Sequence, residues 1–178
     1  MIINILDNQE IKDIIVSFDN SGAKQDESSQ EFYTTSAGVY NLQESLYVVS
    51  RLNKMVQQYY PEAKFSNAYV RQYNNGSILG IHTDRPGLDI TLSVCLENNA
   101  NIEWPLNVSN IIWDGVWDSA KDNLPFKADS VAININVGNG LLCEGVKYPH
   151  WRDKLNCGPD ERIMYVFYHW TIPNNIKE

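Results

Sequence analysis

The sequence predicts a mainly β fold with flanking N-terminal helices, of the double-stranded β-helix (jelly-roll, cupin-like) type. About eight short strand-like segments follow one another from residue 65 onward. Turn-forming stretches separate them, namely NNGS, ENNAN, VGNG and NCGPDE. Many short strands joined by such turns are typical of a jelly-roll, whereas the preceding third of the chain has helical spacing of its apolar residues.

The N-terminal segments should support one face of this β-sandwich. MIINIL is typical of a short strand, and Asp7 and Glu10 after it form a capping box that begins a helix. A second helix should begin after Asn41 and end at Pro61, because proline cannot continue a helix. The apolar stripes expected to be buried are Ile11, Ile14, Ile15 and Phe18 in the first helix, and Leu42, Leu46, Val49, Leu52, Val56 and Tyr59 in the second.

Length and composition indicate one domain over residues 1–178. With 178 residues, of which 43% are hydrophobic, the chain is long enough for one sizeable core. We expect helical support over about residues 1–62 and the double-stranded β-helix core over about residues 65–171. No internal repeat or low-complexity tract is present.

Charge and cysteine content bear on partners and compartment. A formal net charge of -8 opposes nonspecific binding to nucleic acid or to an anionic membrane, and no apolar run is long enough to span a bilayer. The 3 cysteines lack the spacing of a disulfide framework. The start MIINILDNQE has neither the basic region nor the apolar core of a signal peptide. A cytoplasmic location is therefore expected.

A candidate pair of metal ligands, His82 and Asp84, lies within the stretch YNNGSILGIHTDRPGLDITLSVCL. Residues two apart in a strand or tight turn point the same way, so both side chains can bind one ion while Thr83 faces elsewhere. Such a pair occurs often by chance. Here NAYVRQY before it and DITLSVCL after it are strand-like, which places the pair at the edge of a strand.

A second histidine, His150, should reach the pair from a distant strand. The stretch SVAININVGNGLLCEGVKYPHW is typical of two strands around a glycine turn, with the histidine where a strand ends. Arg162 then opens the β-prone run RIMYVFYHW. Two imidazoles and one carboxylate on one face leave coordination positions open, as non-haem Fe(II) oxygenases require.

Over about residues 65–171 the chain resembles the Fe(II)/2-oxoglutarate-dependent oxygenases of the prolyl 4-hydroxylase-like kind, with a weaker match of the N-terminal helices. The resemblance implies that His82, Asp84 and His150 are the catalytic iron ligands. It also implies that Arg162 pairs with the distal carboxylate of 2-oxoglutarate, to which an arginine fork is well matched, and that Tyr73 donates its hydroxyl to the same co-substrate. The implied cofactors are Fe(2+), 2-oxoglutarate as co-substrate and O2, and the implied products include succinate and CO2.

Several assignments have alternatives. Arg152, two residues after His150, competes with Arg162 for the carboxylate, and Arg152 and Arg85 are candidate substrate contacts, as is Arg71. Tyr73 is equally compatible with a packed strand aromatic. His169 beside aromatic residues is expected to be a packed or surface residue. Structural zinc is disfavoured although Cys143, His150 and Cys157 are evenly spaced, because no CxxC motif accompanies them.

The resemblance implies hydroxylation of a C–H bond, in a protein or peptide side chain such as proline. A first alternative keeps these cofactors and acts on a free amino acid, a small metabolite or an alkylated nucleobase. Nucleobase-repair relatives usually carry another arginine six residues after the co-substrate arginine; counted from Arg162, that position is Tyr168 here, and the net charge is also unfavourable. A second alternative is a non-catalytic binding module of the same fold. Residues 20–40 and 110–128 lack periodicity and are expected to cover the substrate. The sequence defines neither the substrate nor the oligomeric state.

Overall fold

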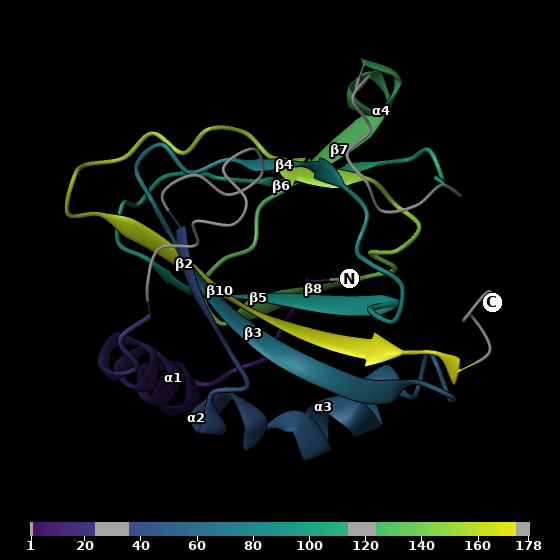
Figure 1. The fold of residues 1–178 in the computed structure, drawn as a ribbon, viewed down its shortest axis with the longest axis horizontal. Helices are drawn as coiled ribbons and strands as arrows, with labels where there is room; N and C mark the ends of the chain where they lie inside the picture. Colours follow the sequence, from purple (N-terminus) through teal and green to yellow (C-terminus); the bar gives the residue numbers. More distant parts are fainter. Residues whose placement is uncertain (1, 24–35, 114–123, 174–178) are drawn as a thin grey trace.

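The computed structural model describes residues 2–23, 36–113 and 124–173 (Figure 1). It confirms the predicted fold class: two antiparallel sheets lie face to face, and α1 to α3 cover the outer side of the larger one. The larger sheet contains, in spatial order, β1 (Ile2–Asn4), β8 (Asn139–Cys143), β5 (Ile90–Asn98), β10 (Arg162–Thr171), β3 (Lys64–Asn74) and β2 (Ser36–Tyr40). The smaller sheet contains β4 (Leu79–His82), β9 (His150–Arg152), β6 (Leu106–Ser109) and β7 (Ser130–Ile133).

Helix α1 (Asn8–Asn20) begins as predicted. The Asp7 carboxylate accepts hydrogen bonds from the backbone N–H groups of Gln9 and Glu10, and the Glu10 carboxylate accepts one from the backbone N–H of Asp7. These bonds satisfy backbone donors that have no partner inside the helix. The side of the helix that carries Ile14 and Phe18 is buried.

The predicted second helix is two helices, α2 (Gln43–Leu46) and α3 (Val49–Val56). The Ser45 hydroxyl donates to the Leu42 carbonyl at 2.6 Å, where it competes with the backbone N–H groups of the next turn. Such side-chain bonds weaken a regular helix, and the β-branched Val48 and Val49 lie where α3 begins. Tyr59, expected in the apolar stripe, lies beyond α3 and is 53% exposed.

The alternation along β10 defines the two faces of the larger sheet. Met164, Val166, Tyr168 and Trp170 belong to the core between this sheet and the helices. The intervening residues of the strand face the smaller sheet, where Ile163, Tyr165 and Phe167 join a second apolar cluster. Because side chains alternate along a strand, a residue of β10 faces either the helices or the space between the sheets.

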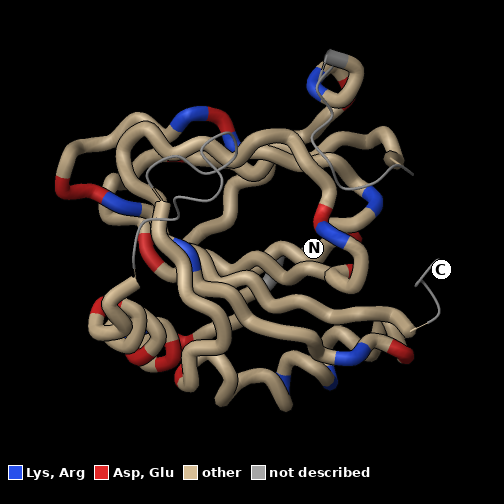
Figure 2. The backbone as a smooth tube through the Cα atoms, in the orientation of Figure 1, with Lys and Arg blue, Asp and Glu red and all other residues tan. Residues whose placement is uncertain are grey.

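Ion pairs join α1 to the rest of the fold. Acidic residues gather on and just before this helix (red in Figure 2), whereas the strand interiors carry few charges. Arg51 of α3 pairs with Glu10 at 2.7 Å. Arg162 of β10 pairs with Asp19 at 2.6 Å. Arg51 therefore joins α1 to α3, and Arg162 joins α1 to the larger sheet.

The two stretches expected to be irregular covers are partly regular. Residues 24–35 and 114–123 lie outside the described residues. The remainder includes β2, which pairs with β3 along its whole length, and α4 (Leu124–Ala128). The expectation failed for β2 because its short sequence, SAGVY, has too few alternating apolar residues to predict a strand. Among the helices that the structure describes, none has the length and hydropathy needed to span a bilayer.

The helix-facing core yields a stability prediction. Ile14 of α1 is 0% exposed, so Ile14→Ala should leave a cavity and lower the free energy of unfolding by about 2–5 kcal/mol. Val16 on the same helix is 49% exposed, and Val16→Ala should change it by less than about 0.5 kcal/mol. Urea denaturation followed by circular dichroism measures both values. Equal effects of the two substitutions would contradict the described packing of α1.

Candidate metal centre

Strand pairing brings the two candidate histidines together. His82 ends β4 and lies opposite His150 in the register of the β4–β9 pair. Their ring centroids are 4.3 Å apart. His150 opens a strand, whereas we expected it where a strand ends. The pairing of these short strands thus joins two segments that are far apart in the sequence.

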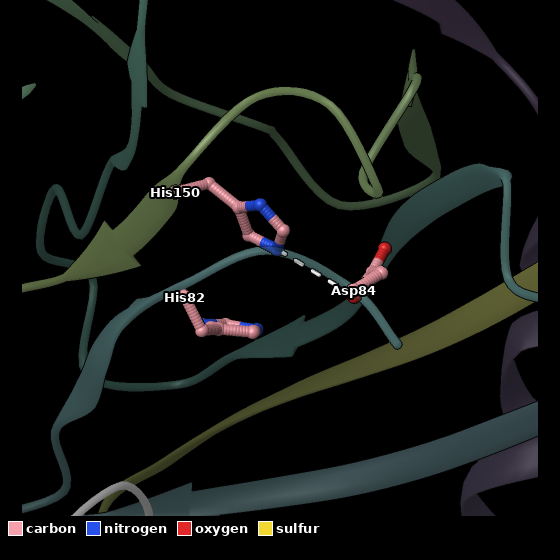
Figure 3. Close-up of side chains that lie close together, drawn as sticks. All are labelled: His82, Asp84 and His150. Atoms are coloured by element: carbon pink, nitrogen blue, oxygen red, sulfur yellow. Dashed lines mark ion pairs between the residues drawn. The ribbon is translucent and has the colours of Figure 1, made fainter. Parts of the chain in front are cut away.

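Asp84 enters the centre from the turn after β4. Its backbone N–H donates to the Gly145 carbonyl at 2.9 Å, and its carboxylate oxygen Oδ2 accepts from the Thr91 hydroxyl at 2.5 Å. The other oxygen, Oδ1, lies 3.8 Å from Nε2 of His150 (Figure 3). A Cβ atom at Gly145 would lie 1.8 Å from Oδ2, so only glycine leaves room for the carboxylate in this position.

Backbone carbonyls orient both imidazole rings. Nδ1 of His82 lies 2.8 Å from the Gly80 carbonyl oxygen, and Nδ1 of His150 lies 2.9 Å from that of Tyr148. A carbonyl oxygen only accepts, so each Nδ1 carries a hydrogen and donates it to the backbone. Such bonds fix the tautomer and direction of a histidine that binds a metal.

The three side chains can bind one metal ion. The ligand atoms offered by His82, Asp84 and His150 all lie within 4.8 Å of one another. No other group of His, Cys, Asp and Glu residues gathers in this way within the described ranges, and Cys143 and Cys157 are not part of the group. Two imidazole nitrogens and one carboxylate oxygen form the donor set of non-haem Fe(II) sites with open positions.

Burial sets the charge state of the centre. It lowers the pKa of His82 to about 4, with the nearby His150 contributing in the same direction. Burial acts to raise the pKa of Asp84, but the neighbouring imidazoles, His150 foremost, and the Thr91 hydroxyl outweigh it and lower that pKa. At neutral pH His82 is therefore a neutral ligand and Asp84 an ionised one, which are the forms that bind a metal.

Arg162 lies on the other side of the larger sheet from the centre. Its Nη1 and Nη2 donate to the two carboxylate oxygens of Asp19 at 2.6 and 3.0 Å. Its Nε donates to Glu97 at 2.5 Å. Met164, on the same face of β10, belongs to the core under the helices. The structure thus places the Arg162 guanidinium among carboxylates on the helix side, away from His82, Asp84 and His150.

Arg152 lies between the sheets. It is 1% exposed and follows His150 by two residues on β9, so both side chains leave the same face of the strand. Its guanidinium carbon lies 4.2 Å from the Tyr165 ring centroid and 4.9 Å from that of Trp104. Nη1 donates to the Trp104 carbonyl, whereas Nε and Nη2 are buried without a hydrogen-bond partner among the described residues.

The other candidate residues are distributed as follows. Tyr73 is 1% exposed and packs edge-on against Trp104, with ring centroids 4.9 Å apart. Arg71 is also buried, and its Nη2 donates to the Tyr69 hydroxyl at 2.7 Å. Arg85 is exposed next to Asp84 and forms no ion pair with a described residue. The structure thus brings Tyr73 and Arg71 into the interior and leaves Arg85 at the surface.

His169, which we expected to be only a packed or surface residue, lies near the centre. It is 7% exposed and stands opposite Thr91, the residue that binds Asp84, in the β10–β5 register. Its Nδ1 lies 3.0 Å from the Asn67 side-chain oxygen. The alternation of β10 could have revealed this position, because His169 shares the inner face with Tyr165 and Phe167.

No protein-family model and no curated protein matches this sequence. Solved structures do match its fold. The match to a Pseudomonas putida prolyl-4-hydroxylase covers 96% of this chain and 91% of the hydroxylase, with 10% sequence identity and a TM-score of 0.66. The match to the viral collagen prolyl hydroxylase of Paramecium Bursaria Chlorella virus-1, solved with 2-oxoglutarate, covers 97% of this chain and 96% of the viral protein. Its sequence identity is 14% and its TM-score is 0.62. The match to HygX of Streptomyces hygroscopicus, solved with nickel, 2-oxoglutarate and hygromycin B, covers 95% of this chain and 82% of HygX. Its sequence identity is 12% and its TM-score is 0.60. The chain therefore has the fold of these two prolyl hydroxylases and of HygX.

Proposed function

We propose that this protein is an Fe(II)- and 2-oxoglutarate-dependent oxygenase that hydroxylates a C–H bond. The observation that carries the proposal is the convergence of His82, Asp84 and His150, with Nδ1 of each imidazole held by a backbone carbonyl. The solved structures of the same fold that hold 2-oxoglutarate, or nickel with 2-oxoglutarate, support the choice of co-substrate.

The residues of the centre suit this chemistry. When bound, the iron, 2-oxoglutarate and O2 supply the oxidation, with succinate and CO2 as products. His82 offers a neutral imidazole, backbone carbonyls set the direction of both imidazole rings, and Asp84 offers a negative charge that partly neutralises the ion. Thr91 and Gly145 hold Asp84 in place. Because His150 is only 7% exposed, the surrounding sheets keep bulk water from much of the centre.

For the substrate, we propose a protein or peptide side chain such as proline. Two of the solved structures that share the fold are named prolyl hydroxylases. A small molecule is the second candidate, because HygX was solved with hygromycin B. An alkylated nucleobase is less well supported, since a formal net charge of -8 opposes binding to nucleic acid. We also propose a cytoplasmic location, which agrees with the free thiols of Cys95, Cys143 and Cys157.

The metal centre can be tested without knowing the substrate. Under anaerobic conditions, Fe(II) and 2-oxoglutarate should give the weak visible absorption band of the chelated complex with the unaltered protein. His150→Ala should abolish the band because it removes one imidazole ligand. His169→Ala is the matched control and should retain it, because His169 is outside the group that can hold the ion. Absence of the band from the unaltered protein would argue against the metal centre.

The space beside Asp84 gives a second prediction. Gly145→Ala should displace the carboxylate and weaken Fe(II) binding about 10- to 100-fold, as substitutions around metal ligands commonly do. Gly158→Ala serves as the control, because a Cβ there would meet only the flexible side chain of Glu161. Titration with Mn(II), followed by electron paramagnetic resonance, measures both affinities. Unchanged affinity in Gly145→Ala would contradict the described position of Asp84.

Turnover tests the reaction and the substrate class separately. With Fe(II), O2 and 2-oxoglutarate, the protein should form succinate, and His82→Ala should form none. Mass spectrometry of an alanine-flanked proline peptide included in the reaction should show a gain of one oxygen atom. Succinate formation without this gain would remove the proline proposal and direct the search to small molecules. If the unaltered protein forms no succinate, with or without the peptide, the oxygenase proposal is refuted.

A further inference from the structure

We propose that Arg152 of β9, and not Arg162 of β10, binds the distal carboxylate of 2-oxoglutarate. This inference rests on the proposed function and names the residue that selects its co-substrate. The evidence is the position of Arg152 relative to the metal ligands, the particular donors that it leaves unsatisfied, and the different use that the fold makes of Arg162.

Arg152 lies next to the metal ligands along β9. Arg152 and His150 leave the same face of one strand, and residues two apart in a strand are about 6.6 Å apart along its axis. A five-carbon diacid that binds the ion through its keto acid end extends its other carboxylate over a comparable length. Arg152 thus lies beside the metal centre at a depth that the co-substrate can reach, inside the space between the sheets.

Two nitrogens of the Arg152 guanidinium have no hydrogen-bond partner among the described residues. Nη1 of Arg152 is used by the Trp104 carbonyl, and the rings of Trp104 and Tyr165 lie near the guanidinium. The donors left over are Nε and Nη2. These two atoms form one edge of the guanidinium, and their parallel N–H groups match the two oxygens of a carboxylate.

Arg152 has no carboxylate beside it among the described residues. Arg152 is 1% exposed and forms no ion pair with any residue in the described parts of the chain. A buried cation without a partner is unfavourable, whereas a carboxylate ligand would supply both the charge and the hydrogen-bond acceptors. Burial also raises the pKa of the nearby Tyr73, an effect that Arg71 and Arg152 oppose, so Tyr73 remains a protonated neighbour.

The Arg162 guanidinium already has hydrogen-bond partners on the helix side of the larger sheet. Its Nε and both terminal nitrogens already donate to Asp19, Glu97 and Gln72 on the helix side of the sheet. The next residue, Ile163, takes the inward position and is 1% exposed in the cluster between the sheets. A difference of one residue along a strand reverses the face, so an arginine at this point of β10 cannot reach the inner space.

Ligand affinity distinguishes the two arginines. We would measure the anaerobic dissociation constant of 2-oxoglutarate from the Fe(II) complex for the unaltered protein, Arg152→Met and Arg162→Met. Arg152→Met should weaken binding about thirty-fold or more, because it removes one partner of a buried charge pair. Arg162→Met should change the constant less than about threefold, although loss of its ion pairs should lower the melting temperature.

Pyruvate is the control ligand, because it has the keto acid end of 2-oxoglutarate and no distal carboxylate. The unaltered protein should prefer 2-oxoglutarate, and Arg152→Met should lose this preference while its pyruvate affinity is unchanged. Equal loss for both ligands would mean a structural role for Arg152 and would overturn the inference. If Arg152→Met does not fold, Arg152→Lys keeps the charge but not the two-donor edge, and it should still reduce the preference.

The outcomes separate this inference from the proposed function. If the unaltered protein binds neither keto acid in the presence of Fe(II), the oxygenase proposal itself fails. If it binds 2-oxoglutarate and the Arg152 variants bind it equally well, only the assignment of Arg152 fails. Loss of the preference in Arg162→Met would return the role to the last strand.

Discussion

The antiparallel pairing of β4 with β9 is the constraint on which the centre depends. It sets His82 opposite His150, and backbone carbonyls on either side then turn both Nε2 atoms to a common point. Neither histidine has a near neighbour in sequence that could supply the second nitrogen. The short strands of the smaller sheet therefore contribute more to function than to the core, most of which lies between the larger sheet and its helices.

The larger sheet completes this arrangement from the opposite side. Thr91 of β5 binds the Asp84 carboxylate, and the absence of a side chain at Gly145 leaves space for it. The inner face of β10 presents Tyr165 to the guanidinium of Arg152, while its outer face packs against the helices. One strand thus carries both the packing that stabilises the fold and part of the wall of the candidate site.

Much of this arrangement was predictable from local sequence. Strand-like runs and turn residues predicted the fold class, and the spacing of His82 and Asp84 with a later histidine predicted which three side chains lie close enough to bind one ion. The face of the sheet on which Arg162 lies was not predictable, because the face of a strand's first residue depends on register, and β10 has irregular pairing with β5 at Met164 and Tyr165. The division between α2 and α3 depends on the hydrogen bond of the Ser45 hydroxyl to the Leu42 carbonyl, which the spacing of apolar residues does not reveal.

The central claim is that one ion is held by three side chains and that a keto acid binds beside it. A crystal structure with Mn(II) and N-oxalylglycine, an inert analogue of 2-oxoglutarate, tests it most directly. We predict metal density between Nε2 of His82, Nε2 of His150 and the Asp84 carboxylate, with the distal carboxylate of the analogue on the free edge of Arg152. Metal bound without these imidazoles, or an analogue bound away from the metal, would contradict the account.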